Sequence, residues 1–105
     1  MYIKEQDIQV KKIMKDYLKA VAVITYKEKG INILENDADN RIGSLMGFVS
    51  KVEVVLSLVD DETTFILYKE YMEKNKKLWW TEYYSRSTYY RHKARALNDF
   101  LKYYN

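Results

Sequence analysis

Apolar side chains recur every three or four residues along most of this 105-residue chain, and this spacing predicts helices. The first predicted helix covers residues 3–29 and ends at Gly30, a residue that adopts the left-handed conformation found after helices. The apolar residues of this helix form a stripe that repeats over two heptads. Such a stripe predicts a partner helix, either in a second copy of the chain or among its own C-terminal helices. We favour a homodimer, because many small helical DNA-binding proteins double their contacts that way. The expected dimer interface is Val10, Met14, Tyr17, Val21 and Ile24.

A polar connector is predicted over residues 31–40, with Asp39 or Asn40 as the N-cap of the next helix. A second helix is then expected over residues 41–58, on an apolar set of Ile42, Leu45, Met46, Val49, Val52, Leu56 and Val59. Gly43 and Gly47, four residues apart, predict a close approach to another helix. Residues 52–58 also alternate as a strand does, but no second strand-like run is present to pair with them.

Three acidic residues, 60–62, mark the boundary between this helix and the next, because acidic side chains favour helix N-termini. The third helix is expected to continue to about Lys74, with Asn75 at its end and a buried stripe of Phe65, Leu67, Tyr68, Tyr71 and Met72. A short helix over 77–82, a turn at 83–84 and a final helix from Ser85 or Arg86 to Tyr104 complete the chain. The pattern predicts one all-α domain of about five helices, with the long helix at 1–30 and a helix-turn-helix at the C-terminal end of 41–105.

Charge is distributed unevenly along the chain. Residues 1–75 have a net charge of −2, residues 76–105 have +5, and the total is +3. Three of the four arginines, Arg86, Arg91 and Arg95, fall within ten residues at the start of the last predicted helix. The positive end of a helix dipole and its unpaired N–H groups also favour an anion there. A basic C-terminal third is typical of a domain that binds a polyanion, although a solvated helix face gives the same count.

Other classes of protein find little support in the composition. There is no cysteine for a disulfide framework or a zinc ribbon, and His92 is the only histidine. No glycine-rich phosphate loop or nucleophile–base pair stands out, so we expect neither an enzyme nor a metal or cofactor. No apolar run approaches the roughly 20 residues that span a bilayer, and no signal-peptide pattern opens the chain, so we expect a cytoplasmic protein without membrane contact.

The segment from Tyr84 to Arg91, together with Lys93, Ala96 and Leu97, resembles the C-terminal helix of the ArpU-type phage transcriptional regulators. More loosely, it is similar to region 4 of bacterial sigma factors, and small uncharacterised proteins of mycoplasma-type bacteria are also similar. The resemblance covers residues 41–104. The N-terminal helix matches only in being long.

The resemblance implies a DNA-binding transcriptional regulator that uses a recognition helix. It implies that Arg86, Ser87, Thr88, Tyr90 and Arg91 face double-stranded DNA, whereas Tyr89, Ala96 and Phe100 face the scaffold. From their charge, we expect Lys93, Arg95 and Lys102 to add non-specific attraction. The alternative is a protein-interaction module of the transcription machinery that contacts RNA polymerase or another partner without strong DNA binding.

Three residues depart from the pattern of these families. Trp79 stands where a small residue is usual in the first helix, Tyr83 stands in place of a glycine in the turn, and Glu82 replaces a buried leucine. Because bulky residues keep packed helices apart, we expect these positions to alter the usual angle between the two helices.

Overall fold

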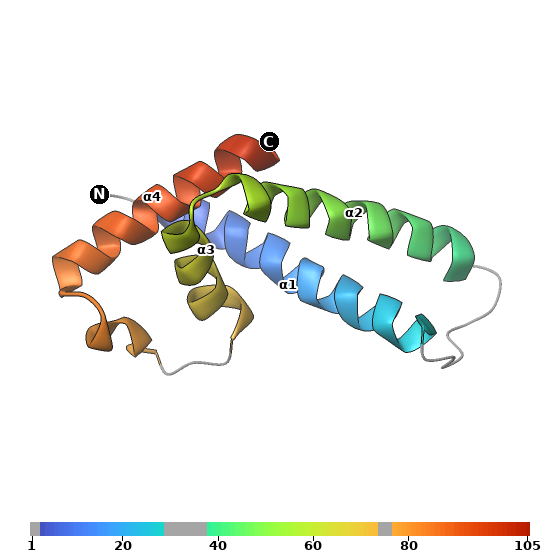
Figure 1. The fold of residues 1–105 in the computed structure, drawn as a ribbon, viewed down its shortest axis with the longest axis horizontal. Coiled ribbons are helices and arrows are strands. Elements are labelled where there is room, and N and C mark those ends of the chain that lie inside the picture. Colours follow the sequence, from blue (N-terminus) through green and yellow to red (C-terminus); the bar gives the residue numbers. More distant parts are fainter. Residues whose placement is uncertain (1–2, 29–37, 74–76) are drawn as a thin grey trace.

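The computed structural model describes residues 3–28, 38–73 and 77–105, and in these ranges the chain is helical, with no strand (Figure 1). The helices are α1 (Lys4–Glu28), α2 (Ala38–Leu58), α3 (Asp61–Leu67) and α4 (Arg86–Tyr104). Two short turns complete the described elements: a π-helical turn, η1 (Tyr68–Met72), and a 3-10 turn, η2 (Trp79–Glu82). The predicted all-α class is therefore confirmed.

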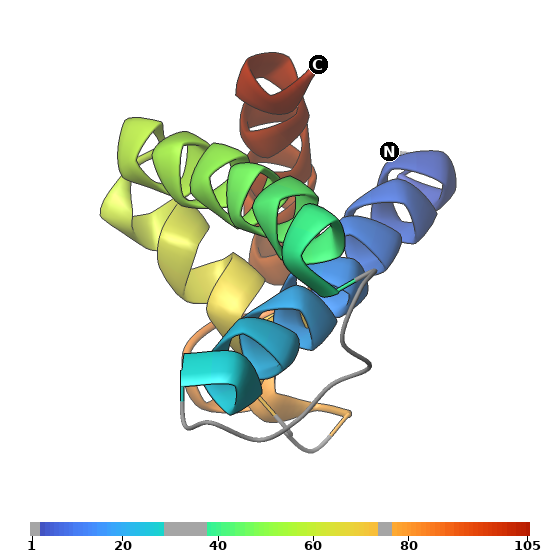
Figure 2. The ribbon, with the colours of Figure 1, turned by 90° about the vertical axis from the view of Figure 1, so that its right-hand side faces the viewer.

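Helices α1 and α2 run antiparallel and form a long hairpin, whereas α3 and α4 lie together at the end where α1 begins and α2 ends (Figure 1). Figure 2 looks along the hairpin, with α3 and α4 behind it. The molecule is elongated, with extents of 50 × 28 × 22 Å. The core lies where the hairpin meets α3 and α4, and its fully buried side chains include Val10, Met14, Val52, Leu67, Leu97 and Phe100.

The stripe predicted on α1 contributes directly to this core. Val10 and Met14 are completely buried against α2, α3 and α4, and Tyr17 packs at the edge of the same cluster. Val21 and Ile24 lie further along the hairpin and are half-buried. Internal packing, the second alternative for this stripe, therefore accounts for Val10 and Met14. These two side chains are not available to a second copy in this fold, and a homodimer stays a prediction that needs another surface.

Helix α2 has the predicted period but differs from the prediction at its start. It begins at Ala38, so Asp39 and Asn40 lie in its first turn and neither is the N-cap. The remainder of the predicted connector, residues 31–37, lies outside the described residues. Gly43 and Gly47 do not mediate a close helix approach, because a Cβ at either position would meet no atom within 4 Å. Met46 is exposed, whereas Ile42, Val52 and Val55 are buried.

Helix α3 begins as predicted, with Asp60 as its N-cap. The Asp60 carboxylate accepts a hydrogen bond of 2.8 Å from the Thr63 N–H. This bond holds the pKa of Asp60 below its usual value, with a smaller contribution from the nearby Arg95 guanidinium.

The α-helix ends at Leu67, earlier than predicted, and the chain continues as the π-helical turn, where the Glu73 N–H donates to the Tyr68 carbonyl at 2.9 Å. Tyr68, at the start of the wider turn, is half exposed, contrary to the prediction. Thr63 and Ile66 of α3 itself are buried together with Leu67. The predicted helix end at Asn75 lies outside the described residues.

Candidate functional site

The first turn of α4 is fixed by Ser85, its N-cap, and the helix starts where the sequence predicted. Ser85 is extended, its hydroxyl accepts the Thr88 N–H at 3.4 Å, and the same hydroxyl donates to Thr88 Oγ1 at 2.9 Å. The Tyr89 N–H donates to the Ser85 carbonyl at 2.9 Å, which begins the helical ladder. The helix therefore has a defined start at Arg86.

An aromatic cluster supports this end of α4 from one side. Tyr89 is 2% exposed and stacks on Trp80 with a centroid distance of 4.6 Å and an interplanar angle of 6°. Trp79 meets the same tyrosine edge-on at 5.8 Å and also meets Phe65 of α3 at 5.9 Å. Tyr83 packs edge-on against Phe65 at 5.3 Å. Trp79 thus bridges Phe65 of α3 and Tyr89 of α4, whereas Tyr83 packs on Phe65 and stays half exposed, and edge-to-face rings are a favourable arrangement for such contacts.

The segment before α4 differs from the predicted short helix. Trp79–Glu82 form one 3-10 turn, in which the Tyr83 and Tyr84 N–H groups both donate to the Trp80 carbonyl at 2.9 Å. Glu82 is exposed, so it does not occupy the interior position where a leucine is expected. A single tight turn is sufficient here, because side-chain packing of Trp79 and Trp80 holds the segment.

Beneath the aromatic cluster lies a partly buried network of charged and polar groups centred on Glu70 of the π-helical turn. One Glu70 oxygen accepts from Trp79 Nε1 and from the Tyr89 hydroxyl, each at 2.7 Å, and the other is 3.3 Å from Lys93 Nζ. Lys93 Nζ also lies 3.4 Å from Asp7 Oδ1, which accepts a 2.5 Å hydrogen bond from the Tyr71 hydroxyl. The network joins α1, η1, η2 and α4, and it orients the α4 N-terminus relative to the core.

Burial raises the pKa of Tyr71 and Tyr89 well above the usual value of 10, and their hydrogen bonds to Asp7 and Glu70 add to the effect. The folded state thus holds these protons more tightly than the unfolded chain does. This stabilisation is complete below about pH 10 and is lost as pH rises further, because only the unfolded state then releases the protons. We expect the free energy of unfolding to fall above pH 10, by about 1.4 kcal/mol per pH unit for each tyrosine.

Urea unfolding between pH 9 and pH 11.5 measures this loss. In Tyr71→Phe, the free energy of unfolding should fall less steeply with pH, because about one fewer proton is released on unfolding. Tyr103→Phe is the matched control, because that exposed ring contacts none of these carboxylates. Equal slopes for the two variants would contradict the prediction.

The residues predicted to face DNA fall into two groups. Arg86, Ser87, Tyr90 and Arg91 are exposed, and Thr88 is half-buried beside Ser85. The predicted scaffold residues Tyr89, Ala96 and Phe100 are buried.

Lys93, expected to add non-specific attraction, is 8% exposed and pairs with Glu70 and Asp7 inside the chain. Arg95 is exposed but contacts Asp60 at 2.6 Å and Asp99 at 3.6 Å, so its charge is largely neutralised. Sequence reasoning missed Asp7 and Glu70, which lie far from Lys93 in the chain and follow no local pattern.

His92 contacts α3 and the segment before α4. Its Nδ1 contacts a Glu62 oxygen, and its ring lies 5.4 Å from that of Tyr84. Within residues 3–28, 38–73 and 77–105, no group of three or more His, Cys, Asp or Glu side chains is placed to hold a metal ion. None of the helices in those ranges is long and apolar enough to cross a membrane.

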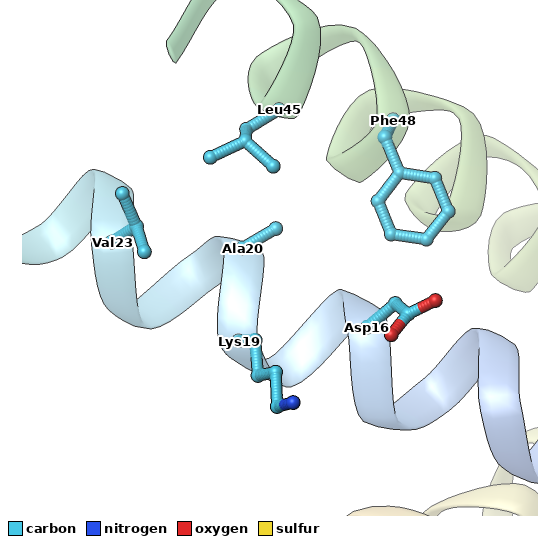
Figure 3. Close-up of a pocket in the computed structure, with 6 residues that line it drawn as sticks. All are labelled: Asp16, Lys19, Ala20, Val23, Leu45 and Phe48. Atoms are coloured by element: carbon cyan, nitrogen blue, oxygen red, sulfur yellow. The ribbon is translucent and has the colours of Figure 1, made fainter. Parts of the chain in front are cut away.

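A groove of about 370 Å³ separates the middle of α1 from α2 (Figure 3). Leu45 of α2 points across it toward Ala20 and Val23 of α1, and Phe48 points toward Asp16, while Lys19 points away from α2. The lining is mostly apolar, and Asp16 is the one carboxylate among these lining residues. We therefore regard the first half of α4 as the candidate functional site.

No family model, curated protein or solved structure matches this chain.

Proposed function

We propose that this protein binds double-stranded DNA through the exposed first half of α4 and acts as a transcriptional regulator. One observation carries the proposal: the first two turns of α4 carry exposed basic and polar side chains, while Tyr89 and Lys93 of the same segment are held by the aromatic cluster and by Glu70. The exposed side chains are Arg86, Ser87, Tyr90 and Arg91. A contact surface of this kind on a rigid helix is what groove recognition requires.

The electrostatics of α4 support the same proposal. Among the described residues, Arg86 and Arg91 are in no ion pair, so their guanidinium groups are available for phosphate or guanine edges. The capped N-terminus adds the positive end of the helix dipole. The charges of Lys93 and Arg95 are already satisfied within the chain. The binding role therefore centres on the two free arginines, with Ser87 and Tyr90 as polar neighbours.

The resemblance to ArpU-type regulators and sigma region 4 adds the proposal that α3 and α4 act as a helix-turn-helix pair. In this arrangement α3 and η1 are the supporting unit, and the 3-10 turn replaces the usual short helix before the recognition helix. Helices α3 and α4 also contact each other directly, through Asp60 with Arg95 and Glu62 with His92, while Trp79 and Tyr83 of the intervening segment pack on Phe65 of α3. A homodimer would present two such helices to a pseudo-palindromic site.

A second candidate function is supported by exposed apolar groups beside the same helix. Leu78, Tyr83 and Tyr68 are each more than half exposed; Tyr83 belongs to the aromatic cluster, and Leu78 directly precedes Trp79 in the chain. Exposed aromatic and aliphatic side chains in one region favour binding to another protein. The partner in this reading is a component of the transcription machinery, such as RNA polymerase.

A salt series on duplex DNA tests the first function against the second. We expect fluorescence anisotropy with a 20-base-pair duplex of mixed sequence to show binding at 50 mM salt that weakens steeply as salt rises. The logarithm of affinity should fall with the logarithm of salt concentration by about 0.9 for each phosphate contacted. Absence of binding at 50 mM salt, together with a stable complex with RNA polymerase, would replace the DNA-binding proposal with the second one.

A further inference from the structure

Helix α1 presents a lysine-rich surface that the proposed function does not use. Successive residues of an α-helix are about 100° apart, which gathers Lys4, Lys11, Lys12, Lys15 and Lys19 within roughly 100° of one another. All five are exposed, and no acidic residue of α1 falls in that sector. We call these five residues the lysine face. The net charge of residues 1–75 is −2 and does not reveal the lysine face, because the acidic residues of this part of the chain lie outside that face.

Most of the lysine face is free to bind an anion. Lys12 pairs with Asp16 at 3.0 Å. Lys4, Lys11, Lys15 and Lys19 have no ion-pair partner among the described residues. The free lysines, from Lys4 to Lys19, extend over about 22 Å of helix. Such a row of point charges is suited to a polymer of negative charges, since each ammonium group takes one phosphate without demanding a fixed geometry.

The surroundings of the lysine face also suit an anion. Figure 3 shows Lys19 pointing away from α2, so the face lies on the side of α1 opposite the hairpin partner. Lys11, Lys15 and Lys19 line a groove of about 350 Å³ that also includes Leu18, Glu70 and Tyr71. The only carboxylate among these lining residues is Glu70, and its charge is taken up by Lys93. The groove is therefore net positive.

We propose that the lysine face is a second DNA-binding surface, which contacts the phosphate backbone independently of sequence. This inference rests on the proposed function of α4 and deepens it. The two free arginines in the first half of α4 supply few phosphate contacts, and four more cations would provide most of the non-specific affinity.

An anionic membrane is a weaker match. The exposed apolar residues of α1, Ile8, Leu18 and Tyr26, are isolated among lysines and form no continuous strip to enter a bilayer.

The test compares salt series of the full chain and of the variant Lys11→Ala/Lys15→Ala. We expect the double variant to flatten the slope by about 1.8, which makes the loss of affinity between 50 and 200 mM salt about tenfold smaller. Lys51→Glu is the matched control, because it changes the net charge equally on α2 and should leave the slope within about 0.5 of the parent. Circular dichroism confirms that all three proteins are equally folded.

The outcomes separate this inference from the function on which it rests. If Lys11→Ala/Lys15→Ala still binds DNA and leaves the slope of log affinity against log salt unchanged, the lysine face is not a DNA-binding surface. The α4 proposal is then unaffected. Absence of DNA binding by the parent chain overturns both. Binding of the parent to phosphatidylserine vesicles that is lost in the double variant, with an unchanged DNA slope, assigns the face to lipid and also overturns the inference.

Discussion

Replacing Lys93 by alanine is expected to lower the free energy of unfolding by about 3 kcal/mol, the largest stability effect of any charged residue in this fold. Lys93 is 8% exposed, and its ammonium group lies between the carboxylates of Glu70 and Asp7 at 3.3 and 3.4 Å. Removing it leaves two negative charges close together without a cation. The surviving carboxylates are partly solvated, so the loss falls at the lower end of the range for buried pairs.

Urea unfolding at pH 7 measures the effect, with three further variants to identify its cause. Lys93→Met keeps most of the side-chain volume and should be nearly as destabilising, because the carboxylates still lack a cation. Adding Glu70→Gln to Lys93→Met should recover part of the loss, since one unpaired charge is then removed. Lys102→Ala removes an exposed lysine of the same helix and should change stability by less than about 0.5 kcal/mol. A loss below 1 kcal/mol for Lys93→Ala would show that the network does not support the fold.

The Glu70 network links stability to the candidate site. The carboxylate that pairs with Lys93 also accepts hydrogen bonds from Trp79 and Tyr89, which hold the start of α4. Lys93 lies near the proposed DNA-binding surface, and through Glu70 it helps to position the start of α4. Variants of Lys93 should weaken DNA binding only to the extent that they disturb the fold, and this separates Lys93 from Arg86 and Arg91.

The sequence predicted best the parts of the fold that depend on local signals. Both long helices and the starts of α3 and α4 were found from apolar spacing, from the acidic residues at 60–62 and from the Ser85–Arg86 boundary. In the structure, Asp60 and Ser85 cap these two helices through N–H groups three residues away. The π-helical turn was missed, because nothing in residues 68–72 distinguishes it from a continuing α-helix. The burial of Lys93 was missed because its partners are 23 and 86 positions away, where no local pattern reveals them.

The candidate site was predictable in part for the same reason. Exposure of Arg86, Ser87, Tyr90 and Arg91 agrees with the expectation, and so does the buried side formed by Tyr89, Ala96 and Phe100. The role of Trp79 and Tyr83 required the structure, because only their contacts with Phe65 show that bulk in the turn is accommodated by aromatic packing. Pairing of Arg95 with Asp60 likewise depends on how α3 and α4 are placed.

The variant Arg86→Ala/Arg91→Ala is expected to weaken DNA binding at 100 mM salt at least 30-fold while leaving the free energy of unfolding unchanged within about 0.5 kcal/mol. Each exposed arginine that contacts a base edge or phosphate contributes about 1–3 kcal/mol to binding. Neither side chain is in an ion pair among the described residues, so its removal costs the fold little. Anisotropy titrations give the affinity, and urea unfolding checks the stability.

Two controls decide what the arginines do. Arg95→Ala removes the same charge from the same helix and should weaken binding less than threefold, because that guanidinium is already bound to Asp60 and Asp99. Arg86→Lys/Arg91→Lys keeps both charges, so it should restore most of the affinity if the arginines meet phosphate. It should restore little if they make paired hydrogen bonds to guanine, since lysine lacks the planar fork. Equal losses for Arg95→Ala and Arg86→Ala/Arg91→Ala would place the DNA contact further along α4 and overturn the assignment to its first half.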